Sequence, residues 1–386
     1  IHTECTDNFK YVRDLGGRAF KNDALIVAGD VTHDLRCFRD TMRTLAARFG
    51  SVFFVPGNHD LWVSGSSECG DSVGKLRALA QICEEEGVET APLRFDLGLT
   101  RPSMWIAPLL SWHAQSFDTE PEIDPRWGGM PCIDDICTDY YATRWPPSWN
   151  PRTDSVAEML DEMNEEIDGI GRNSRGCFLL QGADARARFL MQGADPRSRG
   201  DDLVVTFSHF LPRIELLPEK RYLSVPSLAK MVGSRQLGRR VTRIRPDVHI
   251  FGHTHFGWDQ TLDSVRYLSA PLALPRERSM RLSTVACGDF PIPRADPSVT
   301  ERDRAGLMPL LVWDVDEGFP SRTYEAGWSG FYAEHPRTPE EVTVLPEHVA
   351  RRYTWNDLAH GPKATVSGWN GRKPPWQFAP AWTMRS

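Results

Sequence analysis

The sequence lacks both an excess of positive charge and a long apolar segment. Its 45 Lys and Arg are outnumbered by 52 Asp and Glu, which gives a formal net charge of -7. Proteins that bind nucleic acid commonly carry a basic surface, so this balance disfavours nucleic acid as a partner. No apolar run approaches the roughly 20 residues that a bilayer-spanning helix needs, and we therefore expect no membrane span.

Cysteine is also sparse, with eight residues in 386 and no spacing typical of a metal or disulfide framework. Cys132 and Cys137 are the nearest pair and could form a bridge in an exposed loop. A chain of this length can build a core without disulfides. Free thiols in a reducing compartment are the expected state, so we predict a soluble intracellular protein, in the cytoplasm or an organelle.

Helical and strand patterns alternate along the first third of the chain. Apolar residues recur every three or four positions over 35–49 and 73–83, which predicts helices. Short apolar runs bounded by turn residues predict strands at 24–28, 51–55, 104–107, 203–207, 247–251, 265–269 and 310–313. This rhythm predicts an α/β fold with chemistry in the loops at the strand ends.

The alternation stops between residues 111 and 202, which we interpret as an inserted cap. It contains one amphipathic helix, with an apolar stripe from Val156 to Ile167, and then a tandem duplication over Phe178–Arg199. Two copies are too few for a solenoid, so we interpret them as a loop expansion. We assign 1–317 to one domain and 318–386 to a C-terminal extension packed on the core.

Four short polar motifs directly follow four of the predicted strands. They are Gly29-Asp-Val-Thr-His33, Gly57-Asn-His-Asp60, Ser208-His209 and Gly252-His-Thr-His255. Glycine allows the backbone to turn tightly at such a strand end. Mixed imidazole, carboxylate and amide donors suit Mn, Fe or Zn, and two such ions can share a hydroxide that attacks phosphorus in line. Single histidines of this kind are usually structural, but four motifs in this order favour a two-metal site.

These motifs resemble those of the calcineurin-like metallophosphoesterase superfamily, including uncharacterised plant and algal members. The resemblance covers residues 2 to 255 and implies a four-layer α/β/β/α sandwich. It also implies two transition-metal ions, divalent or trivalent, and a small phosphorylated substrate. Asp30 would bridge the two ions. The remaining ligands would be His2 and His255 on the first ion, and Asn58, His209 and His253 on the second.

The resemblance further implies that His59 acts on the substrate phosphate and that Asp60 orients the His59 ring. His33 would either approach the phosphate or bond a loop carbonyl. Arg213, the first of a group of basic residues that includes Lys220 and Arg221, would either bind phosphate or lie on a solvated face.

The family's first motif is Asp-x-His, and only its last two positions are present here, as Ile1-His2. We therefore expect an aspartate immediately before Ile1 in the natural protein, and an apolar strand before that.

Two functions of different classes fit the sequence. The first is a metal-dependent hydrolase of phosphomonoesters or phosphodiesters, which the complete set of downstream ligands favours. The second is a non-catalytic binding or assembly module built on the same fold.

Overall fold

The computed structural model describes residues 1–15, 20–63, 69–98, 100–165, 202–278, 309–320 and 326–356. Its longer helices are α1 (Thr6–Asp14), α2 (Leu35–Ala46), α3 (Ser72–Glu86), α6 (Ser155–Glu165), α8 (Arg235–Ile244) and α11 (Gly327–Glu334). Short helices are α4 (Ile133–Ile136), α5 (Asp139–Ala142), α9 (Pro275–Arg278) and α12 (Glu347–Ala350). In the part of the chain that is described, none of the helices has the length and apolarity required to traverse a bilayer.

Six strands form the main sheet, in the order β3-β4-β6-β7-β9-β8. They are β3 (Leu93–Phe95), β4 (Met104–Pro108), β6 (Leu203–Phe207), β7 (Val248–Ile250), β8 (Trp258–Leu262) and β9 (Val265–Ser269). The four inner strands are parallel, and the edge strands β3 and β8 run antiparallel to their neighbours. Strands β1 (Ala24–Val27) and β2 (Ser51–Phe54) form a separate parallel pair.

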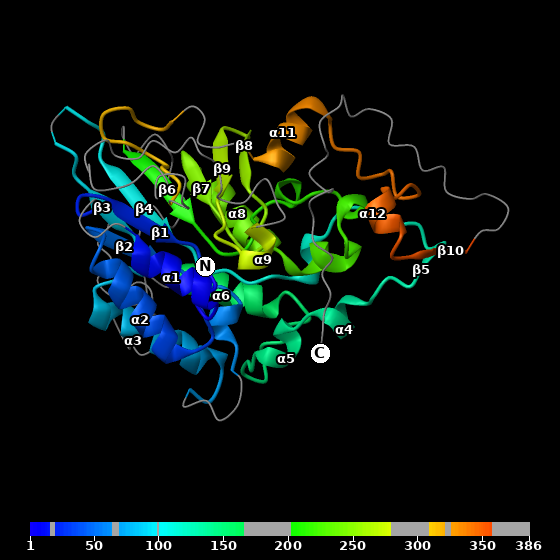
Figure 1. The fold of residues 1–386 in the computed structure, drawn as a ribbon, viewed down its shortest axis with the longest axis horizontal. Helices are drawn as coiled ribbons and strands as arrows, with labels where there is room; N and C mark the ends of the chain where they lie inside the picture. Colours follow the sequence, from blue (N-terminus) through cyan, green and yellow to red (C-terminus); the bar gives the residue numbers. More distant parts are fainter. Residues whose placement is uncertain are drawn as a thin grey trace.

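Strand β2 shows how these layers pack, because successive side chains of a strand point to opposite faces. The ring of Phe53 lies 6.0 Å from Phe95 of β3 and 6.5 Å from Phe207 of β6, between centroids. The next ring, Phe54, lies 5.0 Å from Phe38 of α2. The small sheet is therefore held between the main sheet and the helices α1–α3 (Figure 1).

Local capping sets where the helices beside this small sheet begin. The side chain of Asp34 accepts a hydrogen bond from the backbone of Cys37 at the start of α2. Asp71 does the same for Gly74 at the start of α3, which ends at Gly87 with a φ of 72°. Each cap satisfies a backbone N–H that the helix leaves free, and glycine allows the left-handed exit.

The predicted α/β fold is confirmed. The strands expected near β1, β2, β4, β6, β7 and β9 are all present. The prediction of a strand at 310–313 is wrong, since these residues form no regular element. The sequence predicts neither of the edge strands β3 and β8. Their sequences, Leu-Arg-Phe and Trp-Asp-Gln-Thr-Leu, lack the continuous apolar run of a buried strand.

The segment between β4 and β6 contains α4, α5, α6 and the short strand β5 (Trp127–Gly128). β5 pairs antiparallel with β10 (Thr354–Trp355), so the region after residue 318 contacts this segment. That region also contacts the main sheet, where the Ser329 hydroxyl accepts the Asp259 N–H of β8 at 2.8 Å. Cys132 and Cys137 are both free thiols. The duplication at 178–199 lies outside the described residues.

Candidate metal centre

The six predicted metal ligands gather where the parallel strands end. Asp30 and Asn58 follow β1 and β2, and His209 and His253 follow β6 and β7. His2 is brought to Asp30 by a backbone hydrogen bond, in which the His2 N–H donates to the Asp30 carbonyl at 2.6 Å. The carboxyl ends of parallel strands meet at one edge of their sheet. β1 and β2 belong to the small sheet and β6 and β7 to the main sheet, so the site lies where these edges of the two sheets adjoin.

Two glycines allow the loops to approach one another this closely. A Cβ atom on Gly57 would lie 2.3 Å from Oδ1 of Asp30, and one on Gly29 would lie 2.5 Å from Nδ1 of His209. Both distances are well inside van der Waals contact. A residue without a side chain is therefore required at each of these turns.

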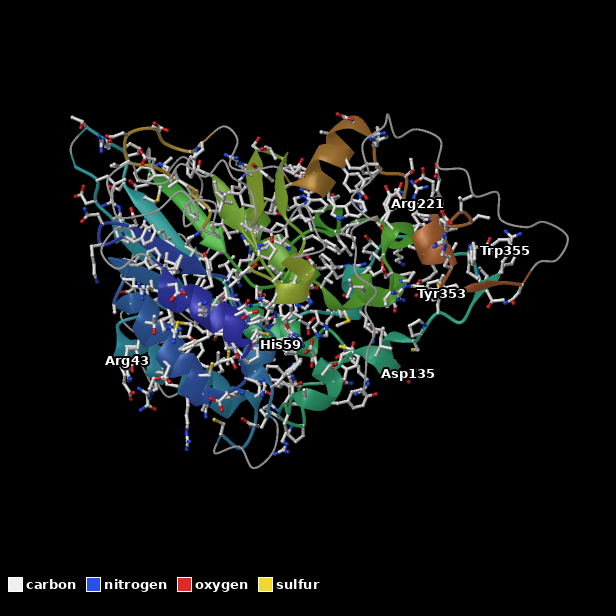
Figure 2. All side chains as sticks on the ribbon, in the orientation of Figure 1. Arg43, His59, Asp135, Arg221, Tyr353 and Trp355 are labelled. Carbon is white, nitrogen blue, oxygen red and sulfur yellow. The ribbon has the colours of Figure 1, made fainter. Side chains whose placement is uncertain are left out.

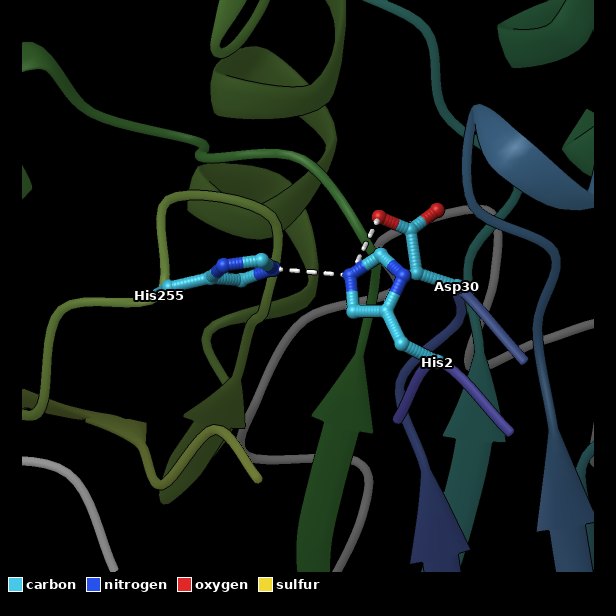
Figure 3. A group of neighbouring side chains, drawn as sticks. All are labelled: His2, Asp30 and His255. Atoms are coloured by element: carbon cyan, nitrogen blue, oxygen red, sulfur yellow. Dashed lines mark hydrogen bonds and ion pairs between the residues drawn. The ribbon is translucent and has the colours of Figure 1, made fainter. Parts of the chain in front are cut away.

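The first group of donors consists of His2, Asp30 and His255 (Figure 3). Nε2 of His2 lies 2.9 Å from Nε2 of His255 and 3.7 Å from Oδ2 of Asp30. The outer nitrogens face carboxylates, with Nδ1 of His2 3.0 Å from Glu4 and Nδ1 of His255 2.6 Å from Glu277. Since ionised carboxylates only accept, each Nδ1 carries a proton, and both Nε2 atoms are turned toward the centre of the group. A cation placed between these two atoms would contact both.

The second group consists of Asp30, Asn58, His209 and His253. Nδ1 of His209 donates to the Ala28 carbonyl at 2.8 Å, and Nε2 of His253 donates to a backbone carbonyl at 2.9 Å. Their other ring nitrogens lie 3.2 Å apart, and each is 3.1 Å from Oδ1 of Asn58. Two ring nitrogens and one amide oxygen thus converge on one point, where either a proton on His209 or a cation would lie between them.

Asp30 lies between the two groups. Its Oδ2 atom is 3.7 Å from Nε2 of His2 and 3.3 Å from Nε2 of His209, while its Oδ1 atom accepts the His59 backbone N–H at 3.0 Å. Burial disfavours the charge of Asp30, but His209 and His59 hold its pKa well below the usual range. The carboxylate is therefore ionised, with one oxygen directed at both groups.

Two of the imidazoles are neutral, as metal ligands must be, whereas Asp30 favours the protonated form of His209. Burial lowers the pKa of His2 to about 4 and that of His253 to about 3, so both rings are neutral at pH 7. Burial also opposes protonation of His209, yet the Asp30 carboxylate raises its pKa above the ordinary value. The donor atoms of His2, Asp30 and His255 lie within 4.8 Å of one another, and so do those of Asp30, His209 and His253. Neutral imidazole with carboxylate and amide oxygen is a donor set that fits transition-metal ions.

Backbone strain is concentrated in the same loops. His2, Asp30, His253 and His255 have positive φ angles of 52°, 51°, 67° and 56°. Residues other than glycine adopt this region at a cost of order 1–3 kcal/mol each. Four such residues around one point indicate that the surrounding structure holds the donors in place for function.

His59 lies beside the first group, on the 3₁₀ helix η1 (His59–Leu61), and is labelled in Figure 2. Its ring stacks on Trp62 at 3.8 Å and contacts His2 edge-on at 4.8 Å, between centroids. Among the described residues, no side chain or backbone group hydrogen-bonds to either ring nitrogen. The half-buried ring is thus fixed in orientation while its nitrogens remain available to a ligand.

Asp60 does not have the position predicted for it. Its Oδ1 atom accepts the backbone N–H groups of Val31 and Thr32, both at 2.9 Å, and its Oδ2 atom accepts that of Gly57 at 2.8 Å. Burial and the Asp30 charge raise the pKa of Asp60 to about 6. The prediction that Asp60 orients the His59 ring is wrong, since this buried carboxylate instead joins the Asp30 and Asn58 loops.

The two predicted substrate-binding residues lie outside both groups. His33 is exposed, with its ring 6.4 Å from Trp62. Arg213 pairs with Glu215 at 2.7 Å and with Asp263, and contacts none of the predicted ligands in the described part of the chain. Lys220 and Arg221 also form ion pairs, with Asp118 at 2.6 Å and with Glu219 at 2.9 Å.

Several residues around the site were not found from the sequence. Glu4 and Glu277 fix the outer nitrogens of His2 and His255. Asp139 of α5 accepts a hydrogen bond from the Asn58 amide at 2.9 Å, and Nε2 of His113 lies 3.2 Å from its other oxygen. Burial opposes ionisation of Asp139, but His113 lowers its pKa below the ordinary value. None of these residues belongs to a motif. Glu4 lies only two positions after His2, so its contact with the His2 ring could have been expected from the sequence.

Residues 1–125 match the family of calcineurin-like phosphoesterases, the family indicated by the motifs. A curated relative, the acyl-carrier-protein phosphodiesterase PptH of Mycobacterium tuberculosis, is 34% identical over 99 residues. This match covers 25% of the present chain and 30% of the relative, so the chain spans about a third of that protein's length.

Two solved structures show partial similarity. The phosphopantetheinyl hydrolase PptH of Mycobacterium tuberculosis aligns with a TM-score of 0.47 and 20% identity, over 73% of this chain and 89% of its own. The protein TT1561 of Thermus thermophilus aligns with a TM-score of 0.32 and 13% identity, over 64% and 75% of the two chains.

Proposed function

We propose that this chain, whose residues 1–125 match the calcineurin-like phosphoesterase family, is a metal-dependent hydrolase of phosphate esters. The observation that carries the proposal is the convergence of donors from four strand ends on two adjacent points. An ordinary core does not require four ring nitrogens and side-chain oxygens from distant loops to face one another at about 3 Å. Two bound cations would occupy the points on which these atoms converge.

His2, Asp30 and His255 would hold one ion, and Asp30, Asn58, His209 and His253 the other. Mn, Fe and Zn suit this mixture of nitrogen and oxygen donors. When bound, a pair of such ions activates water as a nucleophile and neutralises the charge that develops on the phosphoryl group.

His59 would donate a proton to the leaving oxygen of the ester. Its ring nitrogens have no protein partner among the described residues, and stacking on Trp62 at 3.8 Å fixes the plane of the ring. His33 would approach the outer side of the substrate, beyond Trp62. Arg213 is already paired with two carboxylates, so we assign it no part in binding phosphate.

The proposed substrate is a small phosphorylated molecule or a phosphorylated group on a carrier. The relative named as a phosphodiesterase supports a diester, but its match extends over only 30% of that protein. Both diesters and monoesters should therefore be tested.

The test is an assay of the purified chain with p-nitrophenyl phosphate, bis-p-nitrophenyl phosphate and a phosphopantetheine-bearing carrier protein. Each substrate is combined with Mn, Fe, Zn or no added metal. We expect metal-dependent hydrolysis of at least one substrate. The variant His59→Gln should reduce kcat by about 10²–10⁴, the usual contribution of general acid catalysis. Full metal loading without hydrolysis of any substrate would favour the non-catalytic binding module.

A further inference from the structure

We propose that Asp139 is a positioning residue that turns the Asn58 amide so that its oxygen, and not its nitrogen, faces the second metal position. This inference rests on the proposed function. Asp139 lies on α5, in the segment between β4 and β6. It would therefore make metal binding at the core depend on that segment.

The side-chain amide of Asn58 can face the second metal position in two orientations, because its oxygen and nitrogen are similar in size. Only the oxygen has lone pairs that can bind a metal. Nδ2 of Asn58 donates to Oδ1 of Asp139 at 2.9 Å, and Oδ1 of Asn58 lies 3.1 Å from the inner nitrogens of His209 and His253. An ionised carboxylate accepts and cannot donate. Asp139 therefore permits only the orientation with the oxygen inward.

The Asp139 carboxylate is buried and held by its neighbours. Its side chain is 1% exposed, and its Oδ1 atom also accepts the Trp62 indole N–H at 2.6 Å. Its Oδ2 atom lies 3.2 Å from Nε2 of the fully buried His113. Both hydrogen bonds thus hold the Oδ1 atom, whereas Oδ2 is buried without a hydrogen bond from any described residue and lies at ion-pair distance from His113.

Asp139 is also connected to His59 through Trp62. The indole ring that donates to Asp139 is the ring on which His59 stacks. One buried carboxylate consequently orients both a proposed metal ligand and the ring against which the proposed proton donor packs. The alternative is that Asp139 is itself a ligand, because it forms a buried group with His113 and Cys137. The positioning role belongs to Oδ1, which accepts from Asn58 and Trp62, and the ligand alternative belongs to Oδ2, which has no hydrogen bond within the described part of the chain.

The experiment compares metal binding by the full chain and three single variants, using calorimetric titration with Mn²⁺ and elemental analysis. Asp139→Asn removes the acceptor-only group. Glu277→Gln is the matched change in the other group, because Glu277 holds His255. Asp135→Asn is the surface control, an exposed aspartate on α4 four residues before Asp139 (Figure 2).

We expect Asp139→Asn to weaken one of two Mn²⁺ sites by about 10–100-fold, the usual effect of removing a partner of a metal ligand. In a His255→Ala background, which retains the second site, adding Asp139→Asn should weaken Mn²⁺ binding. In a His253→Ala background, which retains the first site, adding Asp139→Asn should leave Mn²⁺ binding unchanged. Glu277→Gln should give the opposite pattern, and Asp135→Asn should match wild type. Circular dichroism and thermal unfolding check that each variant is folded.

A rescue variant separates orientation from simple packing. In the double variant Asn58→Asp with Asp139→Asn, either oxygen at position 58 can face the metal, and the amide at 139 can donate to the other oxygen. We expect tight binding at the second site to return.

The proposal is overturned if Asp139→Asn binds both ions as tightly as wild type, if it weakens both sites equally, or if the double variant fails to recover. A third equivalent of Mn²⁺ that wild type binds and that both Asp139→Asn and Cys137→Ser lose would show that Asp139 is itself a ligand. This result would also overturn the proposal. Metal binding without hydrolysis in wild type would reject the proposed function alone. Hydrolysis by wild type, together with unchanged binding in Asp139→Asn, would reject the role of Asp139 alone.

Discussion

Replacing Asp60 by asparagine tests whether this carboxylate joins the loops or takes part in chemistry. Its two oxygens accept three backbone N–H groups, from Val31, Thr32 and Gly57, at 2.8–2.9 Å. Asparagine keeps one oxygen and turns an NH₂ group toward at least one of these donors. That backbone N–H then has no acceptor, in a place where the side chain is fully buried.

The magnitude follows from these contacts. A buried donor without a partner costs about 1–3 kcal/mol, and hydrogen bonds to a charged group contribute about 1.5–3 kcal/mol, of which part is lost when the acceptor becomes neutral. Burial and the Asp30 charge penalise the ionised form of Asp60, and neutral asparagine removes that penalty. We therefore expect the free energy of unfolding of Asp60→Asn to fall by about 1–2 kcal/mol, less than the sum of these losses. The loops of Asp30 and Asn58 should loosen together, so metal affinity should fall as well.

Urea denaturation at pH 8 measures this change, since the pKa of Asp60 of about 6 leaves its carboxylate ionised there. Asp135→Asn, on an exposed residue, is the control and should leave the midpoint unchanged. The reasoning is refuted if Asp60→Asn has the stability and metal content of wild type but a kcat lower by about 10²–10⁴, because that pattern belongs to a group that takes part in proton transfer.

Three further predictions concern the metal centre. Asp30→Ala and Asn58→Ala should lose metal, whereas His59→Ala should keep it and lose turnover; full metal content in Asp30→Ala by elemental analysis would contradict the assignment. Gly57→Ala should disrupt the site, because its Cβ atom would lie 2.3 Å from Oδ1 of Asp30; a wild-type melting temperature and metal content would refute this. A chelator should abolish activity and lower the melting temperature, since ligands that bind only the folded state stabilise it; added Mn²⁺ should restore both, and an unchanged melting curve would count against a bound ion.

The sequence by itself determined the inner part of this site. Apolar runs ending in glycine defined β1 and β2, and in each case the ligand follows within a few residues. This relation is local: a strand brings the next residues of its own chain to the sheet edge. Parallel strands share an edge of their sheet, so each pair of motifs was expected to meet, and the packing of the small sheet against the main sheet brought the two pairs together.

Only the tertiary structure decided the residues that fix those ligands. Asp139 is 81 residues from Asn58, and Glu277 is 22 residues from His255, so neither contact follows from spacing. The sequence suggested that Asp60 would face its neighbour His59, but folding brings the Val31 and Gly57 backbones to it instead. A side chain hydrogen-bonds to whatever donor the packed chain places beside it, and buried backbone N–H groups must find an acceptor. Motifs therefore identified which atoms can bind metal, while long-range packing determined how those atoms are held.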